Sequence, residues 1–158
     1  MDFKMFWLKN KMIFFGALLV TIIVFALYYR LLFVGFFSDD FHHLWITAHQ
    51  ENVWRYFGAN IIGTRQGGTY APVFNLLLTI QYALFGLHAF WYHLITLIAH
   101  AVNAALLFGI IRRFRLPVWV ATLGSILFIV LPNRTESLAW AAAQTHVFAT
   151  FFYLLSLF

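Results

Sequence analysis

The sequence predicts an all-α membrane protein with about four transmembrane helices and one external amphipathic helix beside the membrane. Of its 158 residues, 63% are hydrophobic and only 9% are charged, whereas soluble domains average about 25% charged residues. The net charge is +5, but the basic residues flank apolar runs and leave no basic stripe for phosphates, so no nucleic-acid partner is expected. Cysteine is absent, which excludes disulfides and thiolate metal sites.

The first predicted span covers residues 12–37, which exceeds the roughly 20 apolar residues needed to cross a bilayer. Lys4, Lys9 and Lys11 precede this span, so we expect the N-terminus on the cytoplasmic side. The run is longer than the apolar region of a cleaved signal peptide, which has about 7 to 15 residues, and no small-residue cleavage site follows it. We therefore expect a retained anchor.

Three further spans are predicted at residues 88–111, 116–132 and 137–158. The second of these four spans is followed by a cluster of arginines: Arg112, Arg113 and Arg115. Basic residues next to a span favour the cytoplasmic side. The lysines before the first span and this arginine cluster should therefore lie on the same side, with residues 38–87 forming an external loop between them. All 158 residues then form one membrane module.

Residues 71–87 are also apolar, but two observations argue against a further span. About sixteen helical residues reach only about 24 Å, which is shorter than the roughly 30 Å hydrocarbon core. Counting them would also make three crossings between the lysines and the arginines, and would put the two clusters on opposite sides. Asn75, Thr79 and Tyr82 recur at helical spacing and add a polar face. We expect a helix lying on the outer membrane surface.

The stretch "FFSDDFHHLW" follows the first span and places Asp39 and Asp40 on the predicted outer side. Charged residues at the end of a span are often simply solvated. Two adjacent carboxylates at a low-dielectric boundary, however, raise the pKa of one of them, and a carboxylate there can act as a base on a bound hydroxyl. We predict that Asp39 and Asp40 are catalytic.

A metal site in this stretch is a weaker hypothesis. His42 and His43 are adjacent, so on a helix their side chains diverge by about 100° and cannot both face one ion with the same aspartate. The loop also lacks the His-x-x-x-His and Glu-x-x-His spacings of metal sites. A divalent cation such as Mg²⁺ or Mn²⁺, held by Asp39, Asp40 and His42, is the one cofactor that the sequence leaves open.

Polar side chains also interrupt the second predicted span. His93, His100 and Asn103 are spaced by seven and three residues, which places them along one stripe of a helix. Such side chains usually form interhelical hydrogen bonds inside a bundle. Two other roles stay open, namely binding of a lipid phosphate and a polar pathway in a transporter. A bis-histidine haem would need His146 as its partner.

Further candidates lie in the external loop and in the turn after the third span. Arg134 and Glu136 are predicted on the same side as Asp39, and a guanidinium group matches the geometry of a phosphate. Arg65 lies in a glycine-rich stretch that matches no known phosphate loop. Arg30, inside the first span, either extends toward the outer interface or faces the acidic pair.

Four stretches of the sequence, in this order, resemble one family: "SDDFHHLW", "GGTYAPVFNLLLTIQYALFGLHAFWYHLITLIAHAVNAALLF", "LPNRTESLAW" and "THVFATFFYLLSLF". Together they are similar to the N-terminal part of the GT-C superfamily of polytopic glycosyltransferases. Within it they are nearest to the transmembrane-and-TPR O-mannosyltransferases and their bacterial relatives. The resemblance covers residues 38–158 and rests on the ordered set rather than on any single motif.

The resemblance implies transfer of a sugar from a polyprenyl-phosphate carrier to a lipid, glycan or protein acceptor on the outer face. Asp39 would then be the base or the carboxylate that positions the acceptor. Glu136 would help to build the site, and residues 71–87 would be the juxtamembrane helix of the family. The bacterial inner membrane is expected rather than the endoplasmic reticulum, because the loops are short.

The sequence also departs from the family pattern. The family's Tyr-Arg-Pro reads Tyr70, Ala71 and Pro72, and the histidine of its His-Pro turn is Leu131. A cation for the phosphate would then have to come from Arg65 or Arg134. The family also has more spans than the four counted here, so we expect the chain to be an N-terminal piece of a longer enzyme. A small membrane protein without enzymatic activity and a transporter subunit are the alternatives.

Overall fold

The computed structural model describes residues 3–58, 70–131 and 134–158. Every regular element in those residues is a helix, which confirms the predicted all-α class. The elements are, in order, α1 (Phe3–Tyr28), η1 (Tyr29–Phe33), α2 (Asp40–His49), η2 (Val53–Phe57), α3 (Pro72–Phe85), α4 (Ala89–Arg113), α5 (Val118–Val130), α6 (Arg134–Ala139), η3 (Ala141–Ala143) and α7 (Gln144–Leu157). Those labelled η are 3₁₀-helices.

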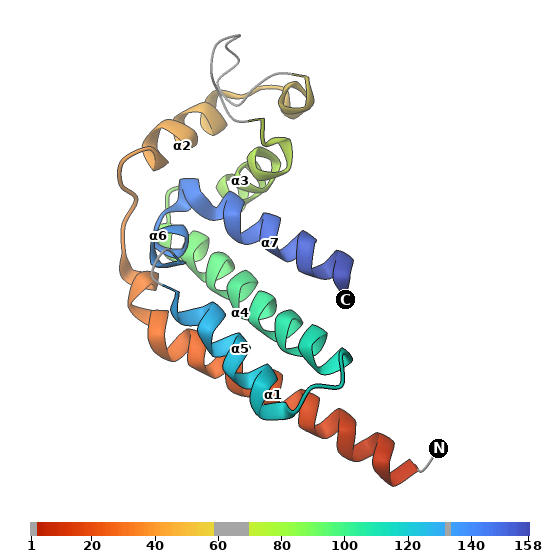
Figure 1. Ribbon diagram of the computed structural model, residues 1–158. Coiled ribbons are helices and arrows are strands. Elements are labelled where there is room, and N and C mark those ends of the chain that lie inside the picture. Colours follow the sequence, from red (N-terminus) through yellow and green to blue (C-terminus); the bar gives the residue numbers. More distant parts are fainter. Residues whose placement is uncertain (1–2, 59–69, 132–133) are drawn as a thin grey trace.

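Helix α4 is the centre of the molecule. It packs against α1 and α5 on one side and against α7 on the other (Figure 1). The side chains of Tyr92, Leu97 and Phe108, spread along its length, are completely buried. A helix that is apolar on all sides must be enclosed by protein or by lipid, and 44% of the apolar stretch of α4 is buried inside the protein.

Helices α1 and α4 run in opposite directions (Figure 1). The N-terminus of α1 and the arginine turn, residues 112–116, therefore lie at the same end of the bundle, whereas α2 and α3 lie at the other end. This is the arrangement that the charge pattern predicted. Which side of a membrane each end faces stays a prediction.

Two helices in the described part of the chain, Ile13–Phe33 and Ala89–Arg113, are long and apolar enough to cross a membrane. The predicted third and fourth spans are not confirmed. Helix α5 has 13 residues and α7 has 14, so they measure about 20 and 21 Å against a hydrocarbon core of roughly 30 Å. The fourth span, predicted from residue 137, is interrupted by residues 140–143 before α7 begins.

The contact between α1 and α4 depends on Gly16. A Cβ atom at this position would overlap the buried ring of Phe108, so only glycine lets the two helices approach so closely. Further along the contact, Val20 and Val24 join a core cluster with residues of α4 and α5: Leu97, Ala101, Ala104 and Ile129. The Tyr28 hydroxyl donates a 2.7 Å hydrogen bond to the Ile129 carbonyl and ties α1 to α5.

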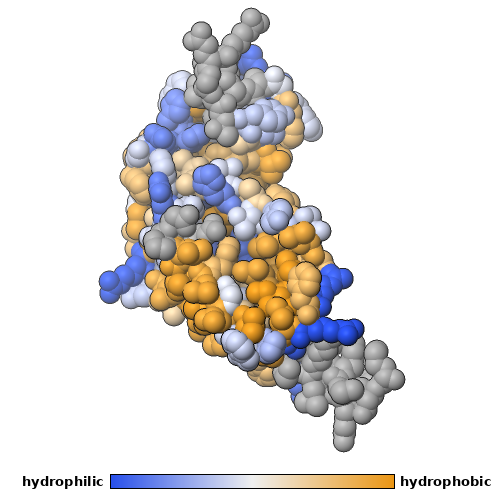
Figure 2. All heavy atoms as spheres, viewed as in Figure 1, coloured by the Kyte–Doolittle hydropathy of each residue, from blue (hydrophilic) through white to orange (hydrophobic). Residues whose placement is uncertain are grey.

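Helix α3 forms where the external surface helix was predicted. Pro72 occupies its first turn, where a missing N–H costs nothing, and Gly86, with φ of 56°, ends it. A second cluster joins α2, α3, α4 and η3 through Leu44, Phe74, Leu78, Tyr92 and Ala141. Figure 2 shows apolar side chains over the four-helix part and hydrophilic ones over the α2 end and near the arginine turn.

Candidate functional site at the α2 end

The acidic pair lies on a turn between η1 and α2. The Asp40 N–H donates a 3.1 Å hydrogen bond to the Phe37 carbonyl, and Ser38 adopts a left-handed conformation with φ of 52°. That conformation costs a non-glycine residue about 1–2 kcal/mol and persists only where the surroundings enforce it. The Asp39 carbonyl accepts the His43 N–H at 3.0 Å and starts α2.

Asp40 connects this turn to a segment 102 residues away. Its side chain is 1% exposed. One oxygen, Oδ1, accepts the Ala142 N–H at 2.7 Å, and Oδ2 accepts the Phe37 N–H at 3.2 Å. Ala142 lies in η3, at the break before α7, where backbone N–H groups need an acceptor from outside the helix. The carboxylate supplies that acceptor.

Burial raises the pKa of the Asp40 carboxyl above its ordinary value, although the N–H groups of Ala142, Phe37 and Ala141 and the nearby His93 oppose this effect. Both oxygens are engaged by backbone donors. The catalytic role predicted for Asp40 stays a prediction. In this structure its carboxylate is buried and bonded to the protein backbone, unlike that of Asp39.

Asp39 has the opposite environment. Its side chain is exposed and makes no capping hydrogen bond at the start of α2. Beside it, the rings of Phe37 and Trp140 stack with centroids 6.1 Å apart and planes 19° from parallel. This stack brings the acidic turn next to α6, on which Glu136 is also exposed. Asp39 and Glu136, two of the three acids predicted for the site, are thus exposed at the same end of the bundle.

The histidines do not complete a metal site with these acids. His42 is exposed, and its ring lies 6.0 Å from that of His43 at an angle of 73°. The His43 ring packs edge-on against Phe74, and burial, followed by the neighbouring His42, lowers its pKa. Within the described residues, no group of three or more His, Cys, Asp or Glu is placed to hold a metal ion. Asp39, Asp40 and His42 therefore do not fit a divalent cation.

The polar stripe of α4 faces the interior of the bundle, as predicted. His93, His100 and Asn103 are at most 2% exposed. The Asn103 side-chain amide donates a 2.9 Å hydrogen bond to the Val147 carbonyl of α7. The His100 ring lies between Tyr28 and Phe128, with centroid distances of 6.1 and 5.1 Å. Their enclosure argues against the predicted contact with a lipid phosphate.

The cationic candidates are only partly described. Arg65 lies outside the described residues, and Arg134 is the first residue of α6 but its side chain is also outside them. Arg30 is exposed on η1, where its Nε donates a 3.4 Å hydrogen bond to the hydroxyl of Tyr29. His146, the partner that a bis-histidine haem would need, is exposed on α7.

Two glutamines that the sequence reading missed hold this end together. Gln81 and Gln144 are 3% and 1% exposed, and the Gln81 Nε2 donates a 3.0 Å hydrogen bond to the Gln144 Oε1. The Gln144 Nε2 in turn donates to the Tyr92 carbonyl at 3.3 Å. These bonds join α3, α7 and α4. The sequence feature that could have identified each of them is a lone amide side chain in an apolar helix, because such groups face other helices.

Comparison of the sequence with known proteins finds one similar protein in two species. The chain is 26% identical to the human (Homo sapiens) protein O-mannosyl-transferase TMTC3, over 86% of this chain. The likeness is to a glycosyltransferase. The mouse (Mus musculus) protein of the same name matches with the same identity and coverage. The chain spans 16% of the length of either relative. No family model and no solved structure matches.

Proposed function

We propose that this chain contributes the acceptor-activating part of a membrane glycosyltransferase. The enzyme would transfer a mannosyl or other hexosyl group from a polyprenyl-phosphate donor to an acceptor on the non-cytoplasmic face. The observation that carries the proposal is the unequal burial of two adjacent carboxylates. The Asp40 carboxylate accepts hydrogen bonds from the backbone N–H groups of Phe37 and Ala142. These bonds fix the turn on which the exposed Asp39 lies. The similarity to an O-mannosyl-transferase supports the reaction class.

Asp39 would act on the hydroxyl of the acceptor. As that oxygen forms a bond to the anomeric carbon of the sugar, the bond from this carbon to the carrier phosphate breaks. The hydroxyl proton passes to the Asp39 carboxylate, and the polyprenyl phosphate leaves with the electron pair. A positioned carboxylate base contributes about 10²- to 10⁴-fold to the rate of such a step.

The leaving phosphate requires a positive charge nearby, because negative charge develops on it as the bond breaks. Arg134 begins α6, the helix that carries Glu136, and it is our first candidate for this contact. Arg65, in the external loop, is the second. Glu136, which is exposed in the first turn of α6, would orient the acceptor.

The test compares sugar transfer by the full-length protein in membranes, with radiolabelled polyprenyl-phosphate mannose as the probe. Asp39→Asn should lower kcat by at least about 100-fold without changing the unfolding temperature, and Asp39→Glu should restore part of the rate. Glu51→Gln is the matched control, since Glu51 is another exposed carboxylate of the same loop. Transfer that is equally active in Asp39→Asn and Glu51→Gln would refute the role of Asp39 and favour a non-enzymatic membrane protein.

The orientation needs its own measurement. The chain has no cysteine, so Ser38→Cys and Arg115→Cys give single labelling sites at the two ends of the bundle. We expect a membrane-impermeant maleimide to label position 38 from the non-cytoplasmic side, and position 115 only after the membrane is opened. The reverse pattern would exclude an external site at Asp39.

A further inference from the structure

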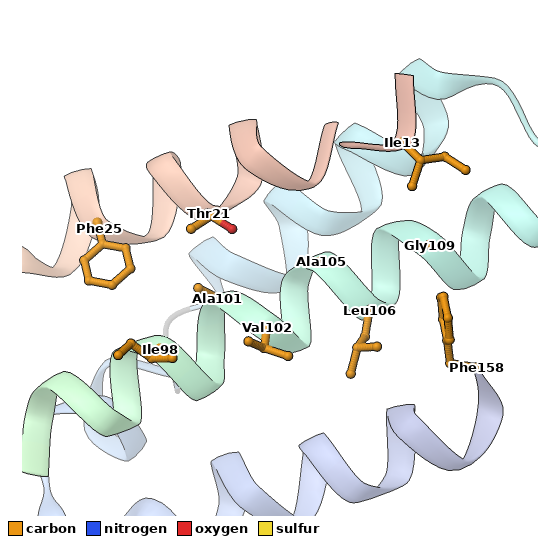
Figure 3. A pocket seen from close by; sticks show the side chains of 10 residues that line it. All are labelled: Ile13, Thr21, Phe25, Ile98, Ala101, Val102, Ala105, Leu106, Gly109 and Phe158. Atoms are coloured by element: carbon orange, nitrogen blue, oxygen red, sulfur yellow. The ribbon is translucent and has the colours of Figure 1, made fainter. Parts of the chain in front are cut away.

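His93 is a buried polar side chain to which the glycosyl-transfer proposal gives no role. It lies in the second turn of α4, and its side chain is 0% exposed. Further along α4, the side chains that line the groove beside α1 are apolar, among them Ile98, Ala101 and Ala105 (Figure 3). Packing of α4 against its neighbours therefore does not need an imidazole, and the surroundings of His93 indicate what the ring does.

The His93 ring lies where three parts of the chain meet. The Val34 carbonyl, in the segment before the acidic turn, and the Leu138 carbonyl, in α6, both act on the ring, and so does the Asp40 carboxylate. All three groups are hydrogen-bond acceptors, whereas a neutral imidazole has one N–H donor and one acceptor nitrogen. The surroundings therefore use the ring as a donor.

Neither ring nitrogen of His93 has a hydrogen-bond partner among the described residues. The two carbonyls are thus near the ring but outside hydrogen-bond geometry. A buried polar group without a partner is costly, and its presence in a folded protein calls for an explanation. A small movement of either segment toward the ring would close a hydrogen bond, so the ring favours one position of each segment.

These carbonyls belong to the two segments that carry the exposed acids. Val34 precedes Asp39 by five residues, and Leu138 follows Glu136 by two. Leu138 is itself 1% exposed, so this part of α6 is enclosed in the core. His93 is fixed on the central helix and therefore provides a common reference for both acids.

We propose that His93 is a positioning residue, which sets the separation between the acidic turn and α6 by donating toward the carbonyls of Val34 and Leu138. The ring does not touch the substrate, and it affects transfer only through Asp39. Its effect on activity rests on the proposed glycosyl transfer, but the separation itself can be measured without any activity.

The first experiment measures that separation. The chain has no cysteine, so Asp39→Cys together with Glu136→Cys provides two spin-labelling sites, one on the turn and one on α6. Double electron–electron resonance on the protein in nanodiscs gives the distribution of distances between the labels. Adding His93→Met, which keeps the bulk of the side chain but removes the N–H donor, should broaden this distribution. Adding His93→Gln, which keeps a donor, should leave it close to that of the labelled parent.

The matched control is His100, the other buried histidine of α4, whose ring lies between Tyr28 and Phe128. His100→Met should leave the distance distribution unchanged. The second experiment is sugar transfer without the labels. His93→Met should lower kcat about 10- to 100-fold, because a misplacement of about 1 Å has effects of this size, with little change in KM. His93→Gln should keep most of the rate.

A distribution that His93→Met leaves unchanged would overturn the proposal. Equal broadening in His93→Gln or in His100→Met would also overturn it, because the change would then come from disturbed packing and not from the lost donor. Broadening in His93→Met alone supports the proposal even if Asp39→Asn still transfers sugar, and that combination would refute the role of Asp39 instead.

A measurement on the unsubstituted ring covers the case in which His93→Met does not fold. With ¹⁵N-labelled histidine, nuclear magnetic resonance should show a hydrogen-bonded ring N–H for His93, shifted downfield of that of the exposed His42. The signal is assigned by its loss in His93→Gln. A ring N–H that matches the one of His42 in shift and exchange rate would overturn the donor role.

Discussion

The two ends of α4 are held in different ways. At its N-terminal end, buried polar side chains hold the surrounding segments together: Asp40 joins the start of α2 to η3, and Gln81 joins α3 to Gln144, which donates to the Tyr92 carbonyl of α4. Along the rest of its length, α1, α5 and α7 pack mainly through apolar and small side chains, and the ring of Phe108 lies against Gly16.

This difference indicates which contacts select one arrangement of the helices over others. Apolar contacts between helices compete with equally apolar lipid, so many arrangements of the bundle have similar energies. A buried hydrogen bond is lost if the partner moves, and the unpaired group is then costly. The end that carries Asp39 is therefore positioned by a few strong contacts, and single substitutions there should have large effects.

The largest effect should come from Asp40→Ala. The substitution leaves the N–H groups of Ala142 and Phe37 without their acceptor, and should lower the free energy of unfolding by about 2–3 kcal/mol. Asp39→Ala should change it by less than about 0.5 kcal/mol. Thermal and denaturant unfolding in detergent micelles measure both. Equal effects of the two substitutions would contradict the assignment of separate roles.

The next effect concerns Gln81 and Gln144. Replacing either one by leucine should cost about 1–2 kcal/mol, because the remaining amide is left buried without its partner. The double variant should cost less than the sum of the two single variants. A double-mutant cycle gives this coupling energy. Strict additivity would mean that the bond between the two amides does not hold α3 to α7.

Stability should also depend on pH through Asp40 and His43, with opposite signs. The pKa of Asp40 is raised from 3.8, so the folded state binds its proton more tightly and gains stability as the pH falls through the raised pKa. The gain should be up to about 1.4 kcal/mol for each unit of the shift. The pKa of His43 is lowered from 6.5, so stability is lost as the pH falls below 6.5.

The single variants Asp40→Asn and His43→Gln separate the two contributions. Unfolding should be measured between pH 7 and pH 4. As the pH falls, Asp40→Asn should keep only the loss of stability that comes from His43, and His43→Gln should keep only the gain that comes from Asp40. A wild-type pH profile that neither substitution changes would disagree with the burial of both groups.

A smaller effect than that of the glutamines should come from the other part of α4. Asn103→Ala removes the hydrogen bond to the Val147 carbonyl, and such bonds between membrane helices average about 0.6 kcal/mol. The measurement is unfolding in micelles under the same conditions as for Gln144→Leu. A cost above that of the glutamine substitution would reverse the contrast between the two ends.

The sequence predicts the long elements well because their patterns are local. Residues 88–111 were predicted as a span, and α4 covers Ala89–Arg113. The break at residues 140–143 could not be predicted. Alanine is the best helix former, so Ala141, Ala142 and Ala143 favour a continuous helix. The hydrogen bond from Ala142 to Asp40 is a tertiary contact that accompanies the break.

The candidate site was predictable only in outline. The acidic pair is visible in the sequence, but the local sequence pattern is the same for Asp39 and Asp40 and does not distinguish the buried one from the exposed one. Which carboxylate is buried depends on how η3 meets the turn at Phe37. The two glutamines lie 63 residues apart, and no spacing rule joins them. The sequence thus indicates which groups are present, while long-range contacts decide which of them stay accessible.

The change from α-helix to 3₁₀-helix at Tyr29 lengthens the path that the chain follows out of the bundle. The five residues of η1 rise about 2.0 Å each, or about 10 Å, where an α-helix would give about 7.5 Å. Residues 34–37 then run without regular structure to the turn at Ser38. A residue inserted in η1 would be absorbed by this stretch, since the turn is anchored by the two hydrogen bonds of Asp40 rather than by the end of η1.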